Sequence, residues 1–171
     1  MPKQSRSSIV HVSDDSYEWF TPPNIIEAAR SVMGSIDCDP ASCHEANVVV
    51  KAKTYFTREM NGLEQLWHGN VWLNPPYNMP LMYEFASRAV CQYAFGNVTQ
   101  AMILTNNSTD TKWFHHLGQF PICFTRGRLK FWNGDKLLAA RQGRSIFYIG
   151  PNVERFRKIF SDFGLVVSSM R

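Results

Sequence analysis

The sequence predicts a single α/β domain in which helices cover both faces of a mostly parallel sheet. Two continuous apolar runs, residues 71–73 and 101–104, are typical of buried parallel strands. Between them, residues 81–94 carry apolar side chains at helical spacing, which indicates a helix that packs on the sheet. Strands that alternate with amphipathic helices define the α/β class, and we expect an antiparallel contribution near the carboxyl end.

Length and composition indicate one globular domain. At 171 residues with 44% hydrophobic side chains, the chain can bury a sizeable core. Residues 1–16 are polar and show no periodicity, so we expect a flexible amino-terminal arm ahead of a domain at residues 17–171. No apolar run approaches the ~20 residues of a membrane span, and the amino terminus has no apolar signal region. We therefore expect a soluble, unsecreted protein with no membrane partner.

The four cysteines predict neither disulfides nor a metal site. Cys38, Cys43, Cys91 and Cys123 are scattered, without the paired short spacings of a disulfide framework or a zinc site. Cys38, Cys43 and His44 have no fourth candidate ligand nearby. We expect thiols typical of a reducing compartment and no bound metal.

The first part of the domain predicts one helix and two strands. Thr21-Pro22-Pro23 is typical of a helix start with Thr21 as N-cap, and Gly34 ends that helix. Residues 35–38 predict the first strand, which leads into Asp39. The β-branched run Val48–Val50 predicts a second strand.

The later elements continue the alternation. A central strand at residues 100–105 leads into the polar loop 106–110, which we expect on the ligand side of the sheet. Thr109 or Asp110 is the predicted cap of a helix that starts at Thr111. The remaining expectations are a strand at 121–125, a mobile loop at 133–144, a strand at 145–149, a helix at 151–160 and a strand at 165–167.

The loop Asn74-Pro75-Pro76-Tyr77 has residue types suited to a reaction. Two consecutive prolines make it stiff, and it follows a strand at the end where open α/β sheets bind ligands. The Asn74 amide oxygen and the Pro75 carbonyl can accept two N–H bonds, and the Tyr77 ring can stack on a heterocycle. The loop therefore suits a flat group with an exocyclic amine. Two such acceptors would free the lone pair of that nitrogen and stabilise the charge that grows during methyl transfer.

Charge is distributed unevenly along the chain. Residues 1–111 hold seven Lys and Arg against eleven Asp and Glu, whereas residues 112–171 hold eleven against three. A basic carboxyl-terminal half suggests either a face for a polyanion or a solvated basic surface without a partner.

A cationic row lies within this basic half. Arg126, Arg128 and Lys130 alternate along a predicted extended segment, so they share one face. They can meet phosphates or guanine edges, and Phe131 or Trp132 can wedge or stack. The alternative is an ordinary solvated strand.

Several motifs in order carry a family resemblance. Asn74–Tyr77 matches an N-P-P-Y signature, and the chain also has E-W-F-T-P-P at 18–23, D-C-D-P-A-S at 37–42, N-G-L at 61–63 and Trp67. Over roughly residues 17–150 the chain resembles the bacteriophage DNA N6-adenine methyltransferase (Dam) family.

The resemblance implies a Rossmann-like fold, S-adenosylmethionine (SAM) as cofactor and double-stranded DNA as partner. It implies transfer to N6 of a flipped adenine, with GATC as a candidate site, in the cytoplasm of a bacterial host. A single small domain can contact only a short stretch of DNA, which further predicts a short recognition site or a homodimer. The implied catalytic residues are Asn74, Pro75, Pro76 and Tyr77. The candidate cofactor residues are Trp19, Thr21, Pro22, Asp39, Pro40, Ala41, Ser42, Asn47 and Asn61. The candidate DNA contacts are Asn106, Asn107, Arg126, Arg128, Lys130, Phe131, Lys136, Arg141 and Arg144.

Two other functions stay open at this point. N-P-P-Y also occurs in enzymes that methylate RNA guanine or protein glutamine, so the substrate can be RNA or protein. The sequence contains no G-x-G, the glycine-rich turn of many methyltransferases. Its absence is compatible with a non-catalytic DNA-binding module that has a degenerate cofactor site.

Overall fold

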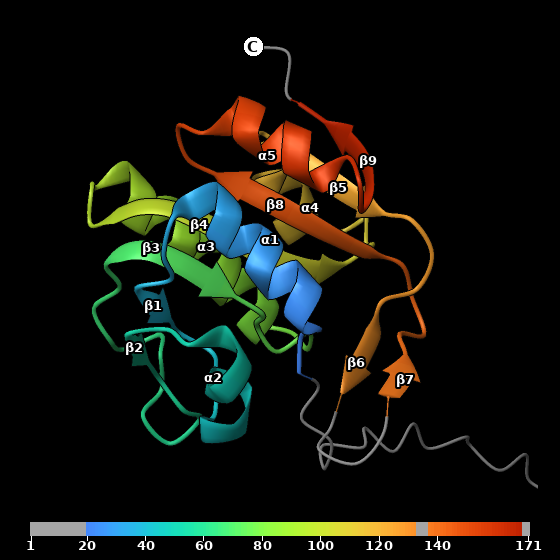
Figure 1. Cartoon of the computed structure of the whole chain (residues 1–171). Helices are drawn as coiled ribbons and strands as arrows, with labels where there is room; N and C mark the ends of the chain where they lie inside the picture. Colours follow the sequence, from blue (N-terminus) through green and yellow to red (C-terminus); the bar gives the residue numbers. More distant parts are fainter. Residues whose placement is uncertain (1–19, 133–136, 169–171) are drawn as a thin grey trace, which may run out of the picture.

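A seven-stranded mixed sheet forms the centre of the protein (Figure 1). The computed structural model describes residues 20–132 and 137–168, so the predictions for Trp19, Lys136 and the amino-terminal arm lie outside the described residues. In spatial order the strands are β2 (Thr54–Tyr55), β1 (Cys38–Asp39), β3 (Gly69–Leu73), β4 (Val98–Asn106), β8 (Arg144–Ile149), β5 (Ile122–Thr125) and β9 (Gly164–Val167).

Strand direction divides the sheet into two halves. The pairings among β2, β1, β3 and β4 are parallel. Those of β8 with β4, of β5 with β8 and of β9 with β5 are antiparallel. The expected α/β class is confirmed, with a parallel half followed by an antiparallel half that is larger than the sequence suggested.

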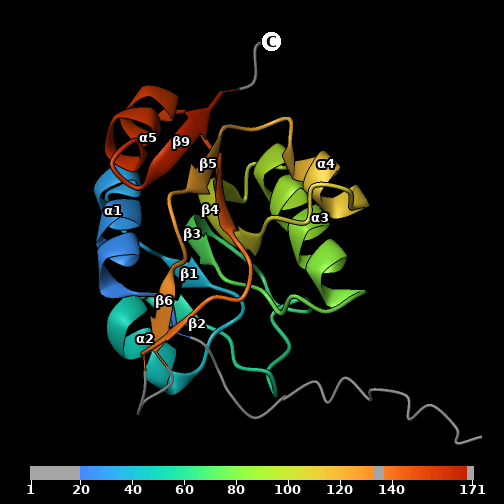
Figure 2. The same cartoon turned by 90° about the vertical axis from the view of Figure 1, so that its right-hand side faces the viewer.

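Helices cover both faces of the sheet, as Figure 2 shows from the side. The helices α1 (Pro23–Met33), α2 (His44–Val50) and α5 (Val153–Phe160) lie on one face, and α3 (Leu81–Ala94) and α4 (Lys112–Leu117) lie on the other. Alternate strand residues supply the two cores. Trp72 and Met102 pack toward α1 and α5, whereas Val71, Leu73 and Ile103 pack toward α3 and α4.

The predicted strand at Val48–Val50 is wrong, because these residues close helix α2. Cys43 is its N-cap and its sulfur accepts a hydrogen bond from the Ala46 N–H at 3.3 Å. Lys51 ends the helix in the left-handed conformation, with φ of 50°. Local caps therefore outweigh the modest strand preference of three valines.

Two predicted caps are also wrong. Pro22 occupies the N-cap position of α1 and no side chain caps that end, so Thr21 does not have this role. Thr111, rather than Thr109 or Asp110, caps α4 by accepting from the Phe114 N–H. Gly34 ends α1 as predicted, with φ of 87°.

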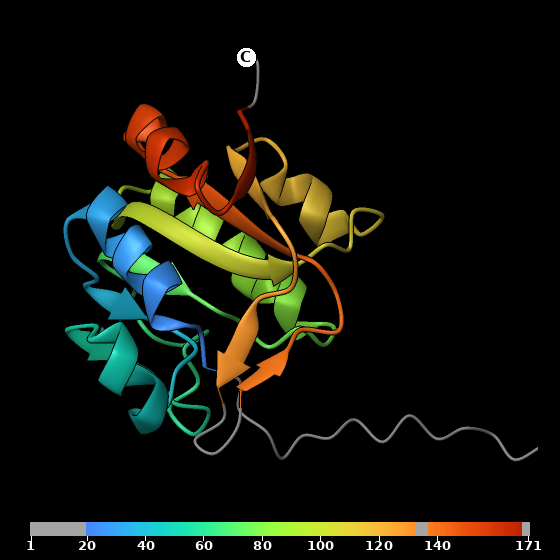
Figure 3. The same cartoon turned by 45° about the vertical axis from the view of Figure 1, so that its right-hand side comes forward.

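A separate two-stranded sheet extends from one end of the main sheet (Figure 3). It pairs β6 (Lys130–Trp132) with β7 (Leu137–Ala139), so part of the predicted loop 133–144 is a strand. The backbone of Trp132 exchanges two hydrogen bonds with Phe20, at 2.8 and 3.2 Å. This small sheet is therefore joined to the segment before α1.

None of the helices in the described part of the chain is long and apolar enough to cross a membrane.

Candidate active site

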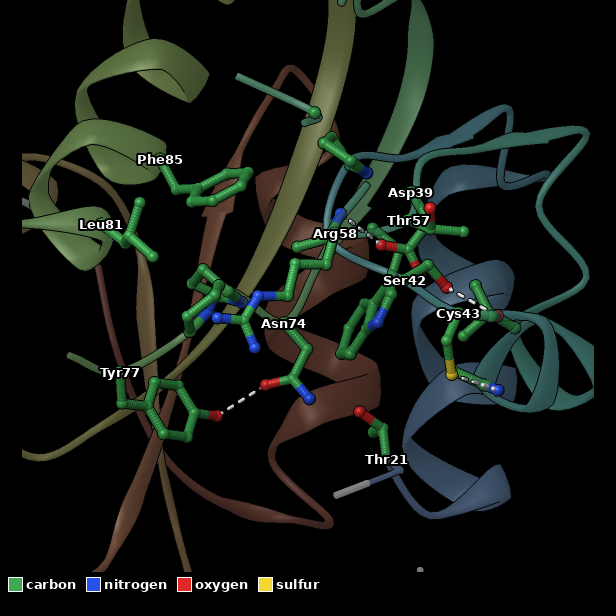
Figure 4. A pocket seen from close by; sticks show the side chains of 18 of the residues that line it. Thr21, Asp39, Ser42, Cys43, Thr57, Arg58, Asn74, Tyr77, Leu81 and Phe85 are labelled. Atoms are coloured by element: carbon green, nitrogen blue, oxygen red, sulfur yellow. Dashed lines mark hydrogen bonds between the residues drawn. The ribbon is translucent and has the colours of Figure 1, made fainter. Parts of the chain in front are cut away.

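A cavity of about 610 Å³ opens at the carboxyl ends of β1 and β3 (Figure 4). Its size is within the usual range of small-molecule sites. It brings together all of residues 74–77 and six of the nine candidate cofactor residues, which are Thr21, Asp39, Pro40, Ala41, Ser42 and Asn61.

Two further cofactor candidates do not line the cavity. The Pro22 carbonyl accepts the Ile25 N–H at 3.0 Å and so belongs to the start of α1. The Asn47 side chain accepts from the Ala52 N–H at 2.9 Å and donates to the Ala52 carbonyl at 3.3 Å. Asn47 therefore stabilises the chain after α2, and the prediction that it contacts a ligand is not supported by its position.

The loop after β3 lies in the wall of the cavity. Asn74 follows Leu73, the last residue of β3, and lines the cavity with Pro75. The Tyr77 hydroxyl donates to Asn74 Oδ1 at 2.6 Å (Figure 4). Within the described residues, no hydrogen bond reaches the Pro75 carbonyl. Asn74 and Pro75, the two residues with the predicted acceptor oxygens, are thus neighbours in the cavity lining.

Tyr77 is held from two directions. Burial raises the pKa of its hydroxyl to about 12, while the nearby Arg144 acts in the opposite direction, so the hydroxyl stays a proton donor at neutral pH. The Arg144 guanidinium lies 4.6 Å from the centroid of the Tyr77 ring and 5.1 Å from that of Phe131. These distances are typical of cation–π contacts. Arg144 therefore connects the loop at residues 74–77 with β6.

Asp39 is a buried carboxyl group in the cavity wall. Only 2% of the residue is exposed. Burial raises its pKa to about 7, against smaller opposing effects of the Ala41 N–H, which donates to Oδ1 at 3.2 Å, and of the Ser42 side chain. A cation or hydrogen-bond donor in the cavity would offset the cost of this burial.

We expect Asp39→Asn to change how stability depends on pH. Between pH 4 and 7 the unfolded wild-type chain releases this proton while the folded protein keeps it, so wild-type stability falls as pH rises through this range. The variant has no such proton. The difference in free energy of unfolding, variant minus wild type, should therefore rise by about 2–4 kcal/mol between pH 4 and pH 7.5. Urea unfolding at several pH values measures this difference, and a constant difference would contradict the buried, proton-bearing state of Asp39.

Asn61 and Gly62 also line the cavity. Asn61 is left-handed, with φ of 51°, and its side chain accepts from the Leu63 N–H and donates to Glu64. Asn61 lines the cavity as predicted, but its amide is engaged in the turn. Gly62 comes so close to Pro40 that a Cβ atom there would lie 1.8 Å from the Pro40 oxygen.

Sequence reasoning missed several residues of the cavity. Arg58 extends into it toward Asn74, and Trp72, Asn78 and Phe85 also line it (Figure 4 labels Arg58, Asn74 and Phe85). Arg58 precedes the Asn61 turn and is one of few cations in an acidic half, which is a signal that could have been used. The position of Trp72 beside the motif carried no signal of its own.

The candidate DNA contacts differ in their exposure to solvent. Arg126, Arg128, Lys130 and Arg141 are exposed, as a DNA-binding role requires. Phe131 is only 2% exposed and belongs to the core, so the prediction that it wedges into DNA is wrong, whereas Trp132 is 39% exposed.

The polar loop after β4 lies apart from the cavity. Neither Asn106 nor Asn107 lines it, although the loop was expected on the ligand side. Asn107 Oδ1 accepts from the Ser145 hydroxyl, and the Asn107 N–H donates to the Gly143 carbonyl at 3.1 Å. These contacts hold the loop to the start of β8.

Two of the four cysteines, Cys38 and Cys123, are buried. Burial raises the pKa of Cys38 and of Cys123 to about 12, so both are thiols at neutral pH. Among the described residues, no group of three or more His, Cys, Asp or Glu side chains is placed to hold a metal ion.

Comparison with known proteins bears on the same segments. A family model described as DNA N-6-adenine-methyltransferase (Dam) matches residues 7–161, which include every wall of the cavity. No curated protein and no solved structure matches the chain. The family match covers most of the sequence, and the chain therefore belongs to the Dam family of DNA N6-adenine methyltransferases.

Proposed function

We propose that this protein transfers a methyl group from SAM to N6 of an adenine that swings out of double-stranded DNA. The observation that carries the proposal is the juxtaposition of the Asn74 and Pro75 acceptors with the buried Asp39 carboxyl group in one cavity. The first two suit an exocyclic amine, and the third suits a polar, cationic cofactor.

The residues of the cavity fit SAM. Asp39 is a buried acceptor without a cationic partner among the described residues, and Thr21, Pro40 and Ala41 give the cavity a largely apolar wall beside it. When bound, SAM supplies an electrophilic methyl group. The sequence has no G-x-G turn, and the glycine that lines this cavity, Gly62, instead allows a close approach to the Pro40 backbone.

Asn74 and Pro75 would act on the adenine amine. Asn74 Oδ1 accepts from the Tyr77 hydroxyl, and in the proposed complex the same oxygen also accepts an N6 hydrogen, since a carbonyl oxygen has two lone pairs. The Pro75 carbonyl can accept the second N6 hydrogen. The two bonds favour a tetrahedral nitrogen and stabilise its growing positive charge, so a strong base is not required. Pro76 stiffens the loop that holds both oxygens.

Tyr77 and Arg144 would position these groups. The hydroxyl fixes the orientation of the Asn74 amide, and Arg144 restrains the ring through its contact with one face. A flipped base costs a few kcal/mol to extrude, and stacking in the cavity offsets part of this cost. The proposal thus assigns Tyr77 both a stacking and a positioning role.

The exposed cations would contact the DNA backbone. Phe20 lines the cavity and pairs with Trp132 at the end of β6, so the segment that carries Arg126, Arg128 and Lys130 leads to the cavity wall. Cations placed there can bind phosphates that flank the extruded adenine.

We expect the triple alanine variant of Arg126, Arg128 and Lys130 to bind duplex DNA more weakly and with less dependence on salt. Loss of three phosphate contacts should reduce the slope of log Kobs against log salt by about 2–3. Fluorescence anisotropy over a range of salt concentrations measures the slope. The matched control replaces Arg155, Arg157 and Lys158, three exposed cations on α5, and should leave the slope nearly unchanged. Equal slopes for both variants would place the DNA elsewhere.

Methylation assays test the function itself. The protein is incubated with labelled SAM and, separately, duplex DNA with and without GATC, RNA, or a glutamine-containing protein extract. Nucleosides and amino acids are then identified by mass spectrometry. The expected product is N6-methyladenine in duplex DNA. Label in RNA guanine or protein glutamine would replace the proposed substrate, and DNA binding without any transfer would favour a non-catalytic module.

A further inference from the structure

Trp72 combines complete burial with an unused hydrogen-bond donor. The residue is 0% exposed and lines the cavity, and its Nε1 has no hydrogen-bond partner among the described residues. Trp67 is equally buried, but its Nε1 donates to the Gly62 carbonyl at 2.8 Å. Leaving a buried donor unpaired is unfavourable, so an unpaired N–H on a residue that lines a cavity points to an acceptor on a bound molecule.

Strand register places this donor beside Asp39. Cys38 of β1 pairs with Val71 of β3 in parallel, and both belong to the core on the α3 face. Because side chains alternate along strands, the next residues, Asp39 and Trp72, both face the opposite side of the sheet, where Trp72 packs with residues of α1. A buried acceptor and a buried donor thus lie on neighbouring strands at the edge of one cavity.

We propose that the indole N–H of Trp72 donates to the carboxylate at the α-amino acid end of the methyl donor, next to Asp39, which in the proposed function accepts from the ammonium group of the same amino acid. This inference rests on the proposed function and assigns a subsite within it. An ammonium group matches Asp39 better than a ribose hydroxyl does, because only the cation compensates the buried carboxylate with an opposite charge. The carboxylate of the same amino acid then supplies the acceptor that Trp72 lacks.

The role of Trp72 is therefore to position the cofactor, and it can be measured without catalysis. Trp72→Phe removes the N–H and keeps an aromatic ring. Calorimetry compares two ligands, S-adenosylhomocysteine, which has the amino acid, and 5′-methylthioadenosine, which has the nucleoside and thioether but no amino acid. The variant should lose about 10- to 100-fold in affinity for the first, the range for a hydrogen bond to a charged group, and less than about 2-fold for the second.

Two further variants make the test specific. Asp39→Asn should show the same selective loss, because it removes the charge opposite the ammonium group while keeping the shape of the side chain. Trp67→Phe is the matched control, since its indole is paired within the protein, and the ratio of the two affinities should not change. Thermal unfolding confirms that each variant is folded under the conditions of the titration.

The outcomes separate this inference from the proposed function. If Trp72→Phe weakens both ligands equally, the indole contacts the nucleoside and the inference is overturned. If it weakens neither while the wild type binds S-adenosylhomocysteine, Trp72 makes no such contact, although the proposed function stands. If the wild type binds neither ligand, both fail.

Discussion

Replacement of Asn74 with alanine is expected to abolish detectable methyl transfer, a loss of about 10³-fold or more, while binding of S-adenosylhomocysteine changes little. The variant loses the acceptor that would hold the N6 hydrogen and stabilise its charge, an electrostatic effect worth about 10²–10³ for one such group in other enzymes. It also frees the Tyr77 hydroxyl, which donates to Asn74 at 2.6 Å, so the stacking ring loses one restraint. Single-turnover transfer to duplex DNA and calorimetry with S-adenosylhomocysteine measure the two effects separately.

Asn78 provides the matched control for this experiment. It is an exposed asparagine four residues along that lines the same cavity. We assign it no role, so Asn78→Ala should retain transfer within a few-fold of the wild type. Comparable activity of the Asn74 variant and the wild type would refute the role of this amide, and a parallel loss in both alanine variants would indicate a general disturbance of the loop.

The second large effect is expected from Gly62→Ala. A Cβ atom at this position would lie 1.8 Å from the Pro40 oxygen and 2.8 Å from its carbonyl carbon, and both are backbone atoms that cannot rotate away. The backbone segments that carry Gly62 and Pro40 must therefore separate, and the Gly62 carbonyl that accepts from Trp67 must move as well. We expect a loss of several kcal/mol in stability and of at least about 100-fold in affinity for S-adenosylhomocysteine.

Thermal unfolding and calorimetry measure these losses, with Gly118→Ala as the control. A Cβ atom at Gly118 would approach the nearest backbone oxygens at 3.3 Å, and Gly118 lies outside the cavity. This variant should bind S-adenosylhomocysteine like the wild type. Unchanged binding by Gly62→Ala would mean that the approach of Gly62 to Pro40 is not needed for the cofactor site.

The parts of the fold that were predictable are those with a strong local pattern. The apolar residues at helical spacing predicted the bounds of α3, residues 81–94, without error. The continuous apolar runs of β3 and β4 identify the central strands. The position of the loop at residues 74–77 was also predictable, because a stiff segment that follows a buried strand emerges at the edge of the sheet where ligands bind.

The errors arise where contacts distant in sequence or local caps decide the structure. Val48–Val50 has a strand composition, but the sulfur of Cys43 caps a helix there instead. Phe131 was predicted to wedge or stack, yet its side chain packs into the core and under the guanidinium of Arg144. The contact between Arg144 and Tyr77 joins segments 67 residues apart, and no local pattern records it.

The order of strands in the sheet has a consequence for how the chain can fold during synthesis. Strands β1 to β4 pair with one another and are complete once residue 106 has been made. Strand β5, at residues 122–125, has its two neighbours in β8 and β9, which come later in the chain. A ribosome-bound chain that ends before residue 144 therefore exposes both an unpaired β4 edge and an unpaired β5, the kind of surface that promotes aggregation of nascent proteins.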